Sequence, residues 1–424
     1  MKNNFLPSAF LFFYRLLLAP LGVLIAFILW PLSNKIKVGF KLRANSKLPK
    51  TFLSQPIWFH ASSGEFEYAK PVITEIKKRH PSTPIVVSFF SPSYEKQIKK
   101  FPGVDFALPL PLDLKNPVRN CIEKINPKLF LVARTDLWPE LLVQLRKRQV
   151  PSLLFSTTFN SSNWAQALFA PYYQLVLSQF TQIFAVSVSD EENIKKCAPG
   201  QSVKTIGDTR YDQVVSRLNG SSTIKDSVFA SSTPIFIAGS TWPADEAQLI
   251  PALTDLIKTS KIKLVLVPHE VNPPHLEQLK KLIHSYGLRP TFYSQCASPD
   301  WSVLIVDQVG ILAELYKLGA FAFIGGSFKR KVHSVMEALA TGAITFVGPF
   351  YKNNREAIEF LSIPNQSPIK AVQVVGSSRE LSEKLSQLLV DPNVSAARQQ
   401  IAEEVRRRTG GAAQVVNWIE SHLN

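Results

Sequence analysis

The sequence contains only three cysteines, Cys121, Cys197 and Cys296, and they lie far apart in the chain. Their number and spacing argue against a disulfide framework and a cysteine-based zinc site, and they fit a reducing compartment. The chain also has no zinc-finger spacing, no aromatic RNA-binding pattern, no short repeat and no low-complexity tract. Nucleic acid is therefore the least supported class of anionic partner, and we expect no nucleic-acid binding.

Acidic residues are absent from the first part of the chain, where the first one is Glu65. The run from Leu16 to Leu32 carries no charge, and its length is at the lower edge for a membrane-spanning helix. Six basic residues follow between positions 35 and 50. An apolar segment with this basic flank predicts attachment to an anionic membrane, with the rest of the chain on the cytoplasmic side. Because no small-residue cleavage site precedes the flank, we expect an uncleaved anchor that either spans the membrane or lies in its interface.

The remaining chain is long enough for two domains with full cores, and the net charge of +16 implies an anionic partner. Apolar runs alternate with helical patterns in two series, which is typical of doubly wound parallel sheets. The pattern loosens around Gly207 to Ser221. We therefore predict an anchor and basic linker (1–50), an N-terminal Rossmann-like domain (51–220) and a C-terminal Rossmann-like domain (221–424). The expected strands are 56–61, 85–90, 105–108, 129–133, 152–156 and 183–186, then 235–238, 264–267, 303–306, 321–324, 344–347 and 372–375.

The stretch from Phe321 to Pro349 shows the strongest local pattern. An apolar run meets two glycines and a basic loop, and a helical pattern from Ser334 then leads to a second apolar run. Open parallel sheets bind ligands beyond the carboxyl ends of their strands, where a helix start favours an anion. Glu337 is placed to accept hydrogen bonds from ribose hydroxyls. The spacing of Ser334 and Glu337 is equally that of a capping box, so spacing alone leaves both interpretations open.

Other candidate residues follow predicted strands. Glu65 comes after Ser62-Ser63-Gly64 and is suited to a general base, although it would also complement the dipole of the helix that it opens. Arg210 in the Gly207–Asp212 turn is suited to a phosphate or carboxylate, or to a surface ion pair. The turns Gly239–Trp242 and Val267–Glu270 have the same strand-end placement, and in both cases an ordinary turn is a full alternative.

From about Trp58 to Glu359, an ordered set of motifs resembles the 3-deoxy-D-manno-octulosonic acid (Kdo) transferases. In chain order the motifs are HASSGE, LWP, GDTRYD, AGSTW, VPHE, DxxGxLxxLY, GGS…HSVMEA and GP…N. The GGS and EA motifs alone resemble GT-B glycosyltransferases in general. The resemblance implies a GT-B fold with a membrane-anchor helix at the inner membrane. It also implies inverting transfer of Kdo from CMP-Kdo to a 6-hydroxyl of a lipid A precursor, with no metal or other cofactor.

The resemblance also implies roles for particular residues. Glu65 is the general base, Asp136 supports the transition state, and Arg210 stabilises charge near the acidic sugar. The nucleotide contacts fall on three turns, and these comprise Pro268 and His269, then Val309, Gly310 and Ile311, then Ser334, Val335, Met336 and Glu337.

The sequence departs from the family pattern at several of these places. Arg134 stands where the family has an acidic residue, His269 where many members have Arg, and Ser334 where most have Asn. An arginine-containing segment of the family is replaced by residues 155–162. Two other hypotheses follow from these changes: a membrane-associated GT-B enzyme that uses a UDP-sugar and a lipid acceptor, or a catalytically inactive GT-B relative that serves as a scaffold.

Overall fold

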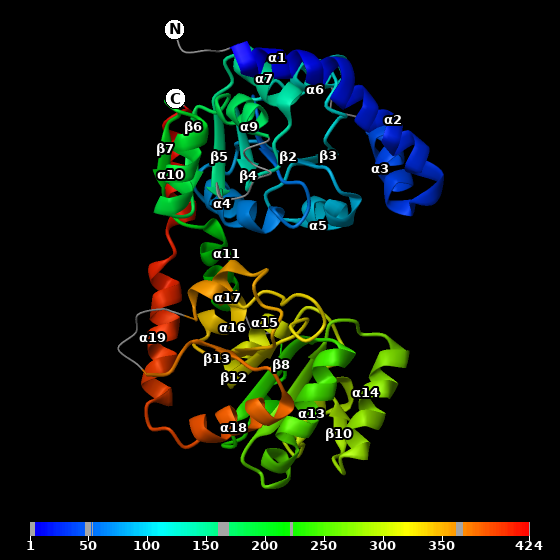
Figure 1. Cartoon of the computed structure of the whole chain (residues 1–424), viewed down its shortest axis with the longest axis vertical. Helices are drawn as coiled ribbons and strands as arrows, with labels where there is room; N and C mark the ends of the chain where they lie inside the picture. The colour runs from blue at the N-terminus through cyan, green and yellow to red at the C-terminus, as the bar shows by residue number, and fades with distance from the viewer. Residues whose placement is uncertain are drawn as a thin grey trace. The chain divides into compact units, whose positions relative to one another are not determined.

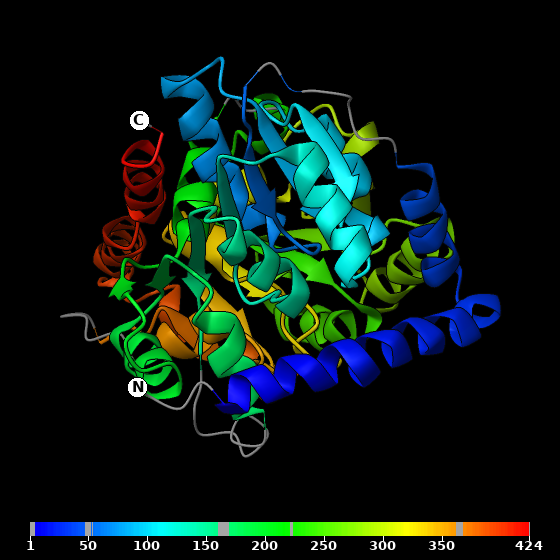
Figure 2. The same ribbon diagram turned by 90° about the horizontal axis from the view of Figure 1, so that it is seen from above.

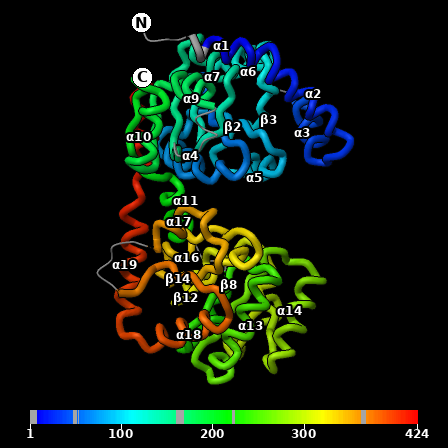
Figure 3. The backbone as a smooth tube through the Cα atoms, in the orientation of Figure 1, coloured from blue at the N-terminus to red at the C-terminus, as the bar shows by residue number. Residues whose placement is uncertain are grey.

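A computed structural model describes residues 5–46, 52, 54–159, 169–220, 224–361 and 368–423. Its contacts divide the chain into two compact units, which we call unit 1 (Met1–Gln213 with Arg408–Asn424) and unit 2 (Val214–Arg407) (Figures 1 and 3). Part of the departing segment at 155–162 and the end of the predicted basic flank lie outside the described residues.

Unit 1 is built on a seven-stranded parallel sheet with the order β3-β2-β1-β4-β5-β6-β7. The chain order therefore reverses between the neighbouring strands β1 and β4. The strands are β1 Ile57–His60, β2 Ile85–Phe89, β3 Phe106–Pro109, β4 Leu129–Ala133, β5 Ser152–Thr157, β6 Gln182–Ala185 and β7 Val203–Thr205. The helices with them are α4 Phe66–Arg79, α5 Glu95–Lys100, α6 Lys115–Ile125, α7 Pro139–Lys147, α9 Ala170–Leu177, α10 Val188–Cys197, the start of α11 Thr209–Leu218, and α20 Gly411–Glu420.

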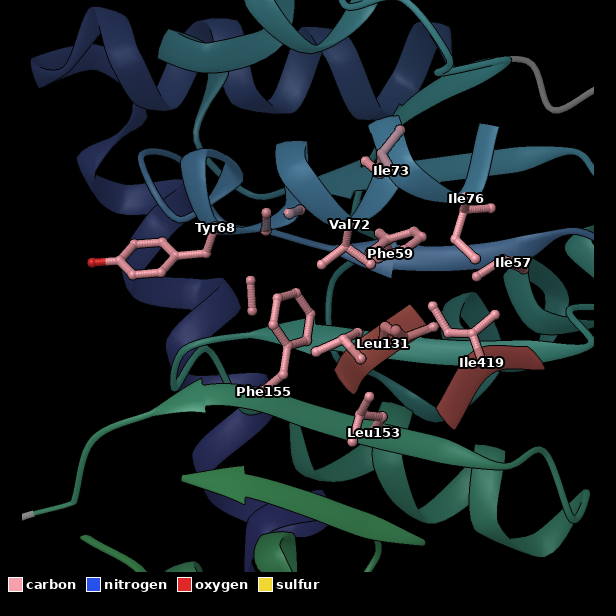
Figure 4. Packing of buried hydrophobic residues seen from close by; sticks show 14 of the residues in the cluster. Ile57, Phe59, Tyr68, Val72, Ile73, Ile76, Leu131, Leu153, Phe155 and Ile419 are labelled. Atoms are coloured by element: carbon pink, nitrogen blue, oxygen red, sulfur yellow. The ribbon is translucent and has the colours of Figure 1, made fainter. Parts of the chain in front are cut away.

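The C-terminal helix α20 packs in unit 1 because one of its faces is apolar. Val415, Val416 and Ile419 are fully buried in the same cluster as β1, β4, β5 and α4 (Figure 4). This differs from the predicted domain division, which assigned the whole C-terminus to the second domain. Gly410, with a φ of 107°, separates α19 Val394–Arg407 from α20.

Unit 2 is also built on a seven-stranded parallel sheet, but its strand order, β10-β11-β9-β8-β12-β13-β14, differs from that of unit 1 because its fourth strand, β11, lies between β9 and β10. Its reversal lies between β8 and β12. The strands are β8 Ile235–Thr241, β9 Lys263–Pro268, β10 Pro290–Phe292, β11 Val303–Ile305, β12 Gly319–Ile324, β13 Ile344–Val347 and β14 Val372–Val374. The helices are α12 Asp226–Phe229, α13 Pro243–Lys258, α14 Pro273–Ser285, α15 Leu312–Leu315, α16 Met336–Ala340, α17 Arg355–Glu359, α18 Ser378–Leu388 and α19. The predicted fold class, two doubly wound Rossmann-like units, is confirmed.

Three helical segments precede the first sheet: α1 Phe5–Phe13, α2 Ala19–Leu29 and α3 Asn34–Asn45. A π-helical turn, η1 Tyr14–Leu18, joins the first two into one rod along the edge of unit 1 (Figures 1 and 2). Pro20 has no N–H to donate to the preceding turn, which favours such an irregular turn just before it. The segment Ser8–Leu32 is long and apolar enough to cross a membrane, with a mean hydropathy of 2.2 and no part of its most apolar stretch buried.

The N-terminal end of this rod is held to unit 1 by polar contacts. Arg15 Nε donates to the buried carboxylate of Glu140 at 2.7 Å, and the Tyr14 hydroxyl donates to Asp113 at 2.7 Å. Asp113 also accepts from the backbone N–H groups of Glu140 and Leu141 at the start of α7. Burial raises the pKa of Asp113 to about 6. These contacts fix the rod against α7 at Tyr14 and Arg15.

Candidate active site

Some of the candidate site residues in each unit follow the strands at which the chain order reverses. In unit 1, Glu65 follows β1 and Asp136 follows β4. In unit 2, Ser240 lies at the end of β8, and the Gly325-Gly326 turn follows β12. The reversal point of an open parallel sheet leaves a crevice at the strand carboxyl ends, because the adjacent connections leave in opposite directions. The topology thus places the candidate residues where ligands bind in such sheets.

Glu65 is held by the turn that it ends. One carboxylate oxygen, Oε2, accepts from the Ser63 backbone N–H at 2.8 Å and from the Ser63 hydroxyl at 3.2 Å. Among the described residues, no protein group donates a hydrogen bond to the other oxygen, Oε1. The side chain is half-buried at the start of α4. The turn therefore orients the carboxylate and leaves one oxygen available to accept a proton.

Asp136 forms a close pair with His60, the last residue of β1. His60 Nε2 lies 2.7 Å from Asp136 Oδ2, and the Trp138 indole N–H donates to the same oxygen at 3.2 Å. His60 is buried, and its Nδ1 lies 2.9 Å from the Ser88 hydroxyl. Burial alone would raise the pKa of Asp136, but the hydrogen bonds and the charge of His60 outweigh it and hold the pKa below its usual value. Asp136 is therefore an anion at neutral pH.

Arg210 and Arg134 both lie over the ring of Tyr68. The guanidinium carbons are 5.9 Å and 4.9 Å from the ring centroid, within cation–π range. Burial raises the pKa of Tyr94, and the charges of Arg210 and Glu65 both act on that hydroxyl as well. Arg210 and Glu65 are therefore close enough to influence the same group, so the structure gathers the predicted catalytic residues at one end of the unit 1 sheet.

Arg134 adopts a left-handed backbone conformation with a φ of 71°, directly after β4. Ser156 in β5 and Ser240 in β8 have φ values of 53° and 55°. Such conformations are unfavourable for residues with a side chain, and they are concentrated at functional sites. The Ser156 hydroxyl accepts from the Thr209 backbone N–H at 3.1 Å, which fixes the start of α11 and hence Arg210.

In unit 2, a cavity of about 330 Å³ gathers three of the predicted nucleotide-binding residues, Gly310, Ser334 and Glu337. Gly310 has a φ of 99°, and a side chain there would meet open space. The Ser334 hydroxyl donates to Glu337 Oε2 at 2.7 Å. This contact orients the carboxylate, while Glu337 still lines the cavity; it is not the predicted capping box, because Val335 is the N-cap of α16 and its side chain makes no capping hydrogen bond. The other lining residues are Arg217, Ser240, Leu312, Ala313, Tyr316 and His333.

His269 is part of a stack of three rings beside this cavity. Its ring lies 4.7 Å from that of Trp242 and 4.3 Å from that of His333, while the Trp242 indole N–H donates to His333 Nε2 at 3.0 Å. The Lys329 ammonium lies 3.2 Å from the Trp242 ring centroid. Burial, together with the neighbouring charges of His269, Lys331 and Lys329, lowers the pKa of His333 to about 4. His333 is therefore neutral at pH 7, as an acceptor of the indole N–H must be.

The glycine-rich turn after β12 is fixed by protein groups. Asp245 accepts from the backbone N–H groups of Gly326 at 2.7 Å and Phe328 at 2.9 Å. A side chain at Gly325 would collide with the backbone of Ser240, 2.0 Å away. The close neighbour that requires a glycine at position 325 is therefore the end of β8. The Thr241 hydroxyl is likewise engaged, since it donates to Glu246 at 2.8 Å.

The remaining predicted nucleotide contacts do not line the cavity. Pro268, Ile311, Val335 and Met336 have buried side chains, and Val309 is 81% exposed. Helix α16 begins at Met336, two residues later than the helical pattern predicted. Any contact from Val335 or Met336 would therefore use the backbone.

Several neighbours of the candidate site were not singled out from the sequence: His60, Tyr68, Arg217, Tyr316 and His333. His60 stands inside the HASSGE motif, so its place at a strand end was a usable signal. The others depend on contacts between distant segments. Among the described residues, no group of three His, Cys, Asp or Glu side chains is arranged to hold a metal ion.

Residues 35–213 match a family model described as 3-deoxy-D-manno-octulosonic-acid transferase (kdotransferase). Over these residues the chain is similar to the Kdo transferase family. A 3-deoxy-D-manno-octulosonic acid transferase of Aquifex aeolicus is 26% identical over 348 residues, which cover 78% of this chain and 86% of that protein. The Haemophilus influenzae protein of the same name is 25% identical over 355 residues, covering 78% and 81%. The family is one of glycosyltransferases, so the chain is an enzyme of that class.

Solved structures support the fold. A UDP-GlcNAc 2-epimerase from Neisseria meningitidis superposes with a TM-score of 0.59 at 15% identity, covering 87% of this chain and 99% of that chain. A glycosyltransferase from Rickettsia africae gives 0.56 at 14% identity, covering 88% and 100%. At such low identity the likeness concerns the fold alone, and it agrees with the GT-B arrangement of two Rossmann-like units.

Proposed function

We propose that this chain moves Kdo from CMP-Kdo to a hydroxyl of a lipid A precursor, with inversion at the anomeric carbon. The observation that carries the proposal is that Glu65, Asp136 and Arg210 follow β1, β4 and β7 and so lie at the same, carboxyl end of the unit 1 sheet. This grouping lies in the part of the chain that matches the family model. The same residues are the ones for which the family resemblance implies catalytic roles.

In this proposal Glu65 is the general base. An inverting transfer needs one base on the face opposite the leaving group and forms no covalent intermediate. Glu65 Oε1 takes the proton of the acceptor hydroxyl while the hydroxyl oxygen bonds to the anomeric carbon. The bond from that carbon to the phosphate oxygen breaks at the same time, and its electron pair leaves with CMP. Ser63, which donates twice to Oε2, holds the carboxylate in place throughout.

Arg210 and Asp136 have electrostatic roles in the proposed reaction. Kdo carries a carboxylate and CMP a phosphate, so a guanidinium near the reacting carbon stabilises the charge of both. Asp136 is kept ionised by His60, and a carboxylate next to an oxocarbenium-like centre stabilises its positive charge. These side chains supply the proposed chemistry without a metal ion or another cofactor.

The unit 2 cavity is the proposed CMP site. Glu337 accepts from the ribose hydroxyls, and Gly310 permits close approach of the nucleotide to the backbone. His269 extends this site through its stack with His333, which lines the cavity. The turns around the cavity also contain Pro268, Val309 and Ile311. In this proposal Val335 and Met336 contact the nucleotide through their backbone groups. Arg217 is the cation that lines this cavity, and we assign the phosphate to it.

The N-terminal rod is the proposed membrane attachment, on the cytoplasmic side of the inner membrane. Arg15 lies seven residues inside the apolar segment, hence about 10 Å from its start at 1.5 Å per residue. If the segment crossed an apolar layer about 30 Å thick, the Glu140 that holds Arg15 would be drawn into that layer. The ion pair therefore favours a rod that lies in the interface, with its apolar side in the anionic leaflet.

The testing experiment measures sugar transfer by the purified full-length chain in detergent. CMP-Kdo, generated in situ, is supplied with tetraacylated lipid A precursor, and UDP-sugars are offered to the same acceptor in parallel. We expect product from CMP-Kdo alone, and inverted stereochemistry at the anomeric carbon by NMR. Product from a UDP-sugar would favour the second hypothesis, a UDP-dependent enzyme. Absence of both transfer and nucleotide binding would favour the scaffold.

A further inference from the structure

Unit 1 contains a second cavity, of about 470 Å³, between α2–α3 and the turn that precedes α4. Volumes of about 300–1,000 Å³ are typical of ligand pockets. Most of its wall is apolar, formed by Ala26, Ile36, Phe40, Phe90, Pro92 and Leu112. The polar groups on its wall are three serine hydroxyls and two cations. A site with so few hydrogen-bonding groups suits a hydrocarbon chain better than a sugar or a base.

This cavity reaches the turn of the proposed base. Ser62 and Ser63 line it, and Ser63 is the residue that holds the Glu65 carboxylate with its N–H and its hydroxyl. An occupant of the cavity would therefore place whatever is attached to its end next to Glu65. For an acyl chain, the attached group is the sugar headgroup of the acceptor.

The two cations of the cavity wall lack carboxylate partners. Arg43 donates to the backbone carbonyls of Leu110 at 2.9 Å and Gly39 at 3.0 Å, and its guanidinium lies over the Phe90 ring. Lys35 is exposed at the cavity edge. Within the part of the chain that the structure describes, neither takes part in an ion pair. Their positive charge is complementary to a phosphate on a lipid headgroup.

The cavity is also continuous with the apolar rod. Ala26 in its wall belongs to α2, and exposed apolar side chains surround that position on the same helix, including Leu24, Ile25, Phe27 and Ile28. If the rod lies in the membrane interface, hydrocarbon can pass from the leaflet to the cavity without crossing water. The hairpin between α2 and α3 is braced by stacking of Trp30 on Phe40, which is itself a lining residue.

We propose that this cavity binds an acyl chain of the phosphorylated lipid acceptor, and that Lys35 contacts a phosphate of the same molecule. The inference rests on the proposed function, because it assigns the acceptor's position in the same reaction. It identifies the part of the acceptor that the enzyme recognises: one hydrocarbon chain together with an anionic headgroup.

The first test fills the cavity from two sides. Ala26→Trp on α2 and Leu112→Trp after β3 both project a large ring into it, while Leu24→Trp on the exposed face of α2 is the matched control. We expect both filling variants to raise KM for tetraacylated acceptor about tenfold and to leave KM for a deacylated acceptor unchanged. Leu24→Trp should behave like wild type with both acceptors. Unchanged KM in both filling variants, with CMP binding and melting temperature preserved, would overturn the inference.

The second test addresses the charge. Lys35→Ala removes a cation of the cavity wall, and Lys37→Ala removes an exposed one from the same helix that does not line the cavity. We expect Lys35→Ala to raise KM several-fold for phosphorylated acceptor and to have no effect with a dephosphorylated acceptor. Equal effects of the two substitutions would show that the lysine acts through general attraction to the membrane, and would contradict the phosphate contact.

A binding measurement separates this inference from the proposed function. A phosphatidic acid with a photoreactive acyl chain is cross-linked to the full-length chain, and the labelled peptides are identified by mass spectrometry. Labelling in 26–43 and 90–112 that Ala26→Trp abolishes would support the cavity even if Kdo transfer were never observed. Kdo transfer without labelling of these segments would leave the function standing and reject the cavity as an acyl site.

Discussion

Unit 1 and unit 2 are both built on seven-stranded parallel sheets, and both have candidate residues after the carboxyl ends of their strands, yet the groups differ in kind. Unit 1 brings together ionised side chains, with Asp136 paired to His60 and Arg210 over Tyr68. Unit 2 places a stack of neutral rings, with His333 kept uncharged beside Trp242 and His269, next to a cavity that Arg217 and Glu337 also line. Charged side chains, one of which has a carboxylate oxygen without a hydrogen-bond donor, suit proton transfer and charge stabilisation, whereas neutral rings beside a cavity suit the binding of a ligand. The comparison therefore supports the proposal that unit 1 carries the chemistry and unit 2 binds the nucleotide.

The largest effect should come from Glu65→Gln in unit 1. The amide keeps an oxygen to accept from Ser63, but it cannot take a proton, so kcat should fall by about 10²–10⁴-fold. The dissociation constant for CMP should not change, because that site is assigned to unit 2. Turnover and calorimetric CMP binding are the two measurements.

Glu67→Gln is the matched control for this substitution. Glu67 is the next acidic residue on α4, and it pairs with Lys70 rather than with the turn. Its replacement should leave kcat within about twofold of wild type, since a partly exposed pair contributes little. If both variants retained full activity, Glu65 would be a helix-start residue only and the chemistry would lie elsewhere.

A second prediction concerns unit 2, where a substitution should affect CMP binding and not the rate. Glu337→Gln in unit 2 should weaken CMP binding about 10-fold to 100-fold, because hydrogen bonds to a carboxylate contribute about 1.5–3 kcal/mol. The rate with saturating donor should change little. Equilibrium titration with CMP and kcat at saturation measure the two effects.

Ser334→Ala separates the two interpretations of Glu337. It removes the hydroxyl that donates to Glu337 but leaves the carboxylate in the cavity, so its effect on CMP binding should be smaller. A lowered melting temperature in both variants with unchanged CMP affinity would mean that the pair only stabilises the start of α16.

The sequence predicts local features, such as strands and motifs, better than contacts between segments that are far apart in the chain. The strands 129–133 and 344–347 were predicted to the residue, because each is a short apolar run in the interior of a sheet. The strands Val203–Thr205 and Pro290–Phe292 were missed, since they are three residues long, lie at sheet edges and include polar residues or proline. Glu65, Asp136 and Glu337 remain predicted site residues, and they could be proposed because each stands in a motif of the family resemblance.

Contacts between segments that are far apart in the chain have no comparable pattern in the sequence. Arg15 and Glu140 are 125 residues apart, and a single sequence contains nothing that pairs them. The unit 2 stack likewise requires Trp242, His269 and His333 to be brought together by three strand ends. Gly325 is a further example, because the backbone of Ser240, 85 residues earlier in the chain, leaves no room for a side chain there.

The N-terminal rod belongs to unit 1, and its attachment gives a third prediction. Arg15→Gln leaves the Glu140 carboxylate, whose side chain is 1% exposed, without its cation. Breaking a buried pair costs about 3–5 kcal/mol, and the partial exposure of Arg15 reduces this to about 1–3 kcal/mol. We expect a lower melting temperature and earlier proteolysis within the rod, whereas Arg15→Gln combined with Glu140→Gln should recover part of the loss. A double variant less stable than either single one would contradict the pairing.

The smallest effect concerns the charge state of the unit 2 stack. Because the pKa of His333 is about 4 in the folded chain and about 6.5 in a free side chain, the unfolded chain takes up the proton first as the pH falls. The contribution of His333 to stability is therefore complete above pH 6.5 and is lost between pH 6.5 and about 4. Titration of the histidine ring protons by NMR should show His333 still neutral at pH 5.5. Lys329→Ala removes one of the positive charges that act on His333, so it should move the pKa upward by a fraction of a unit. A wild-type His333 that titrates near pH 6.5 would mean that the ring is neither buried nor bound by Trp242, and the contrast between a charged unit 1 site and a neutral unit 2 site would fail.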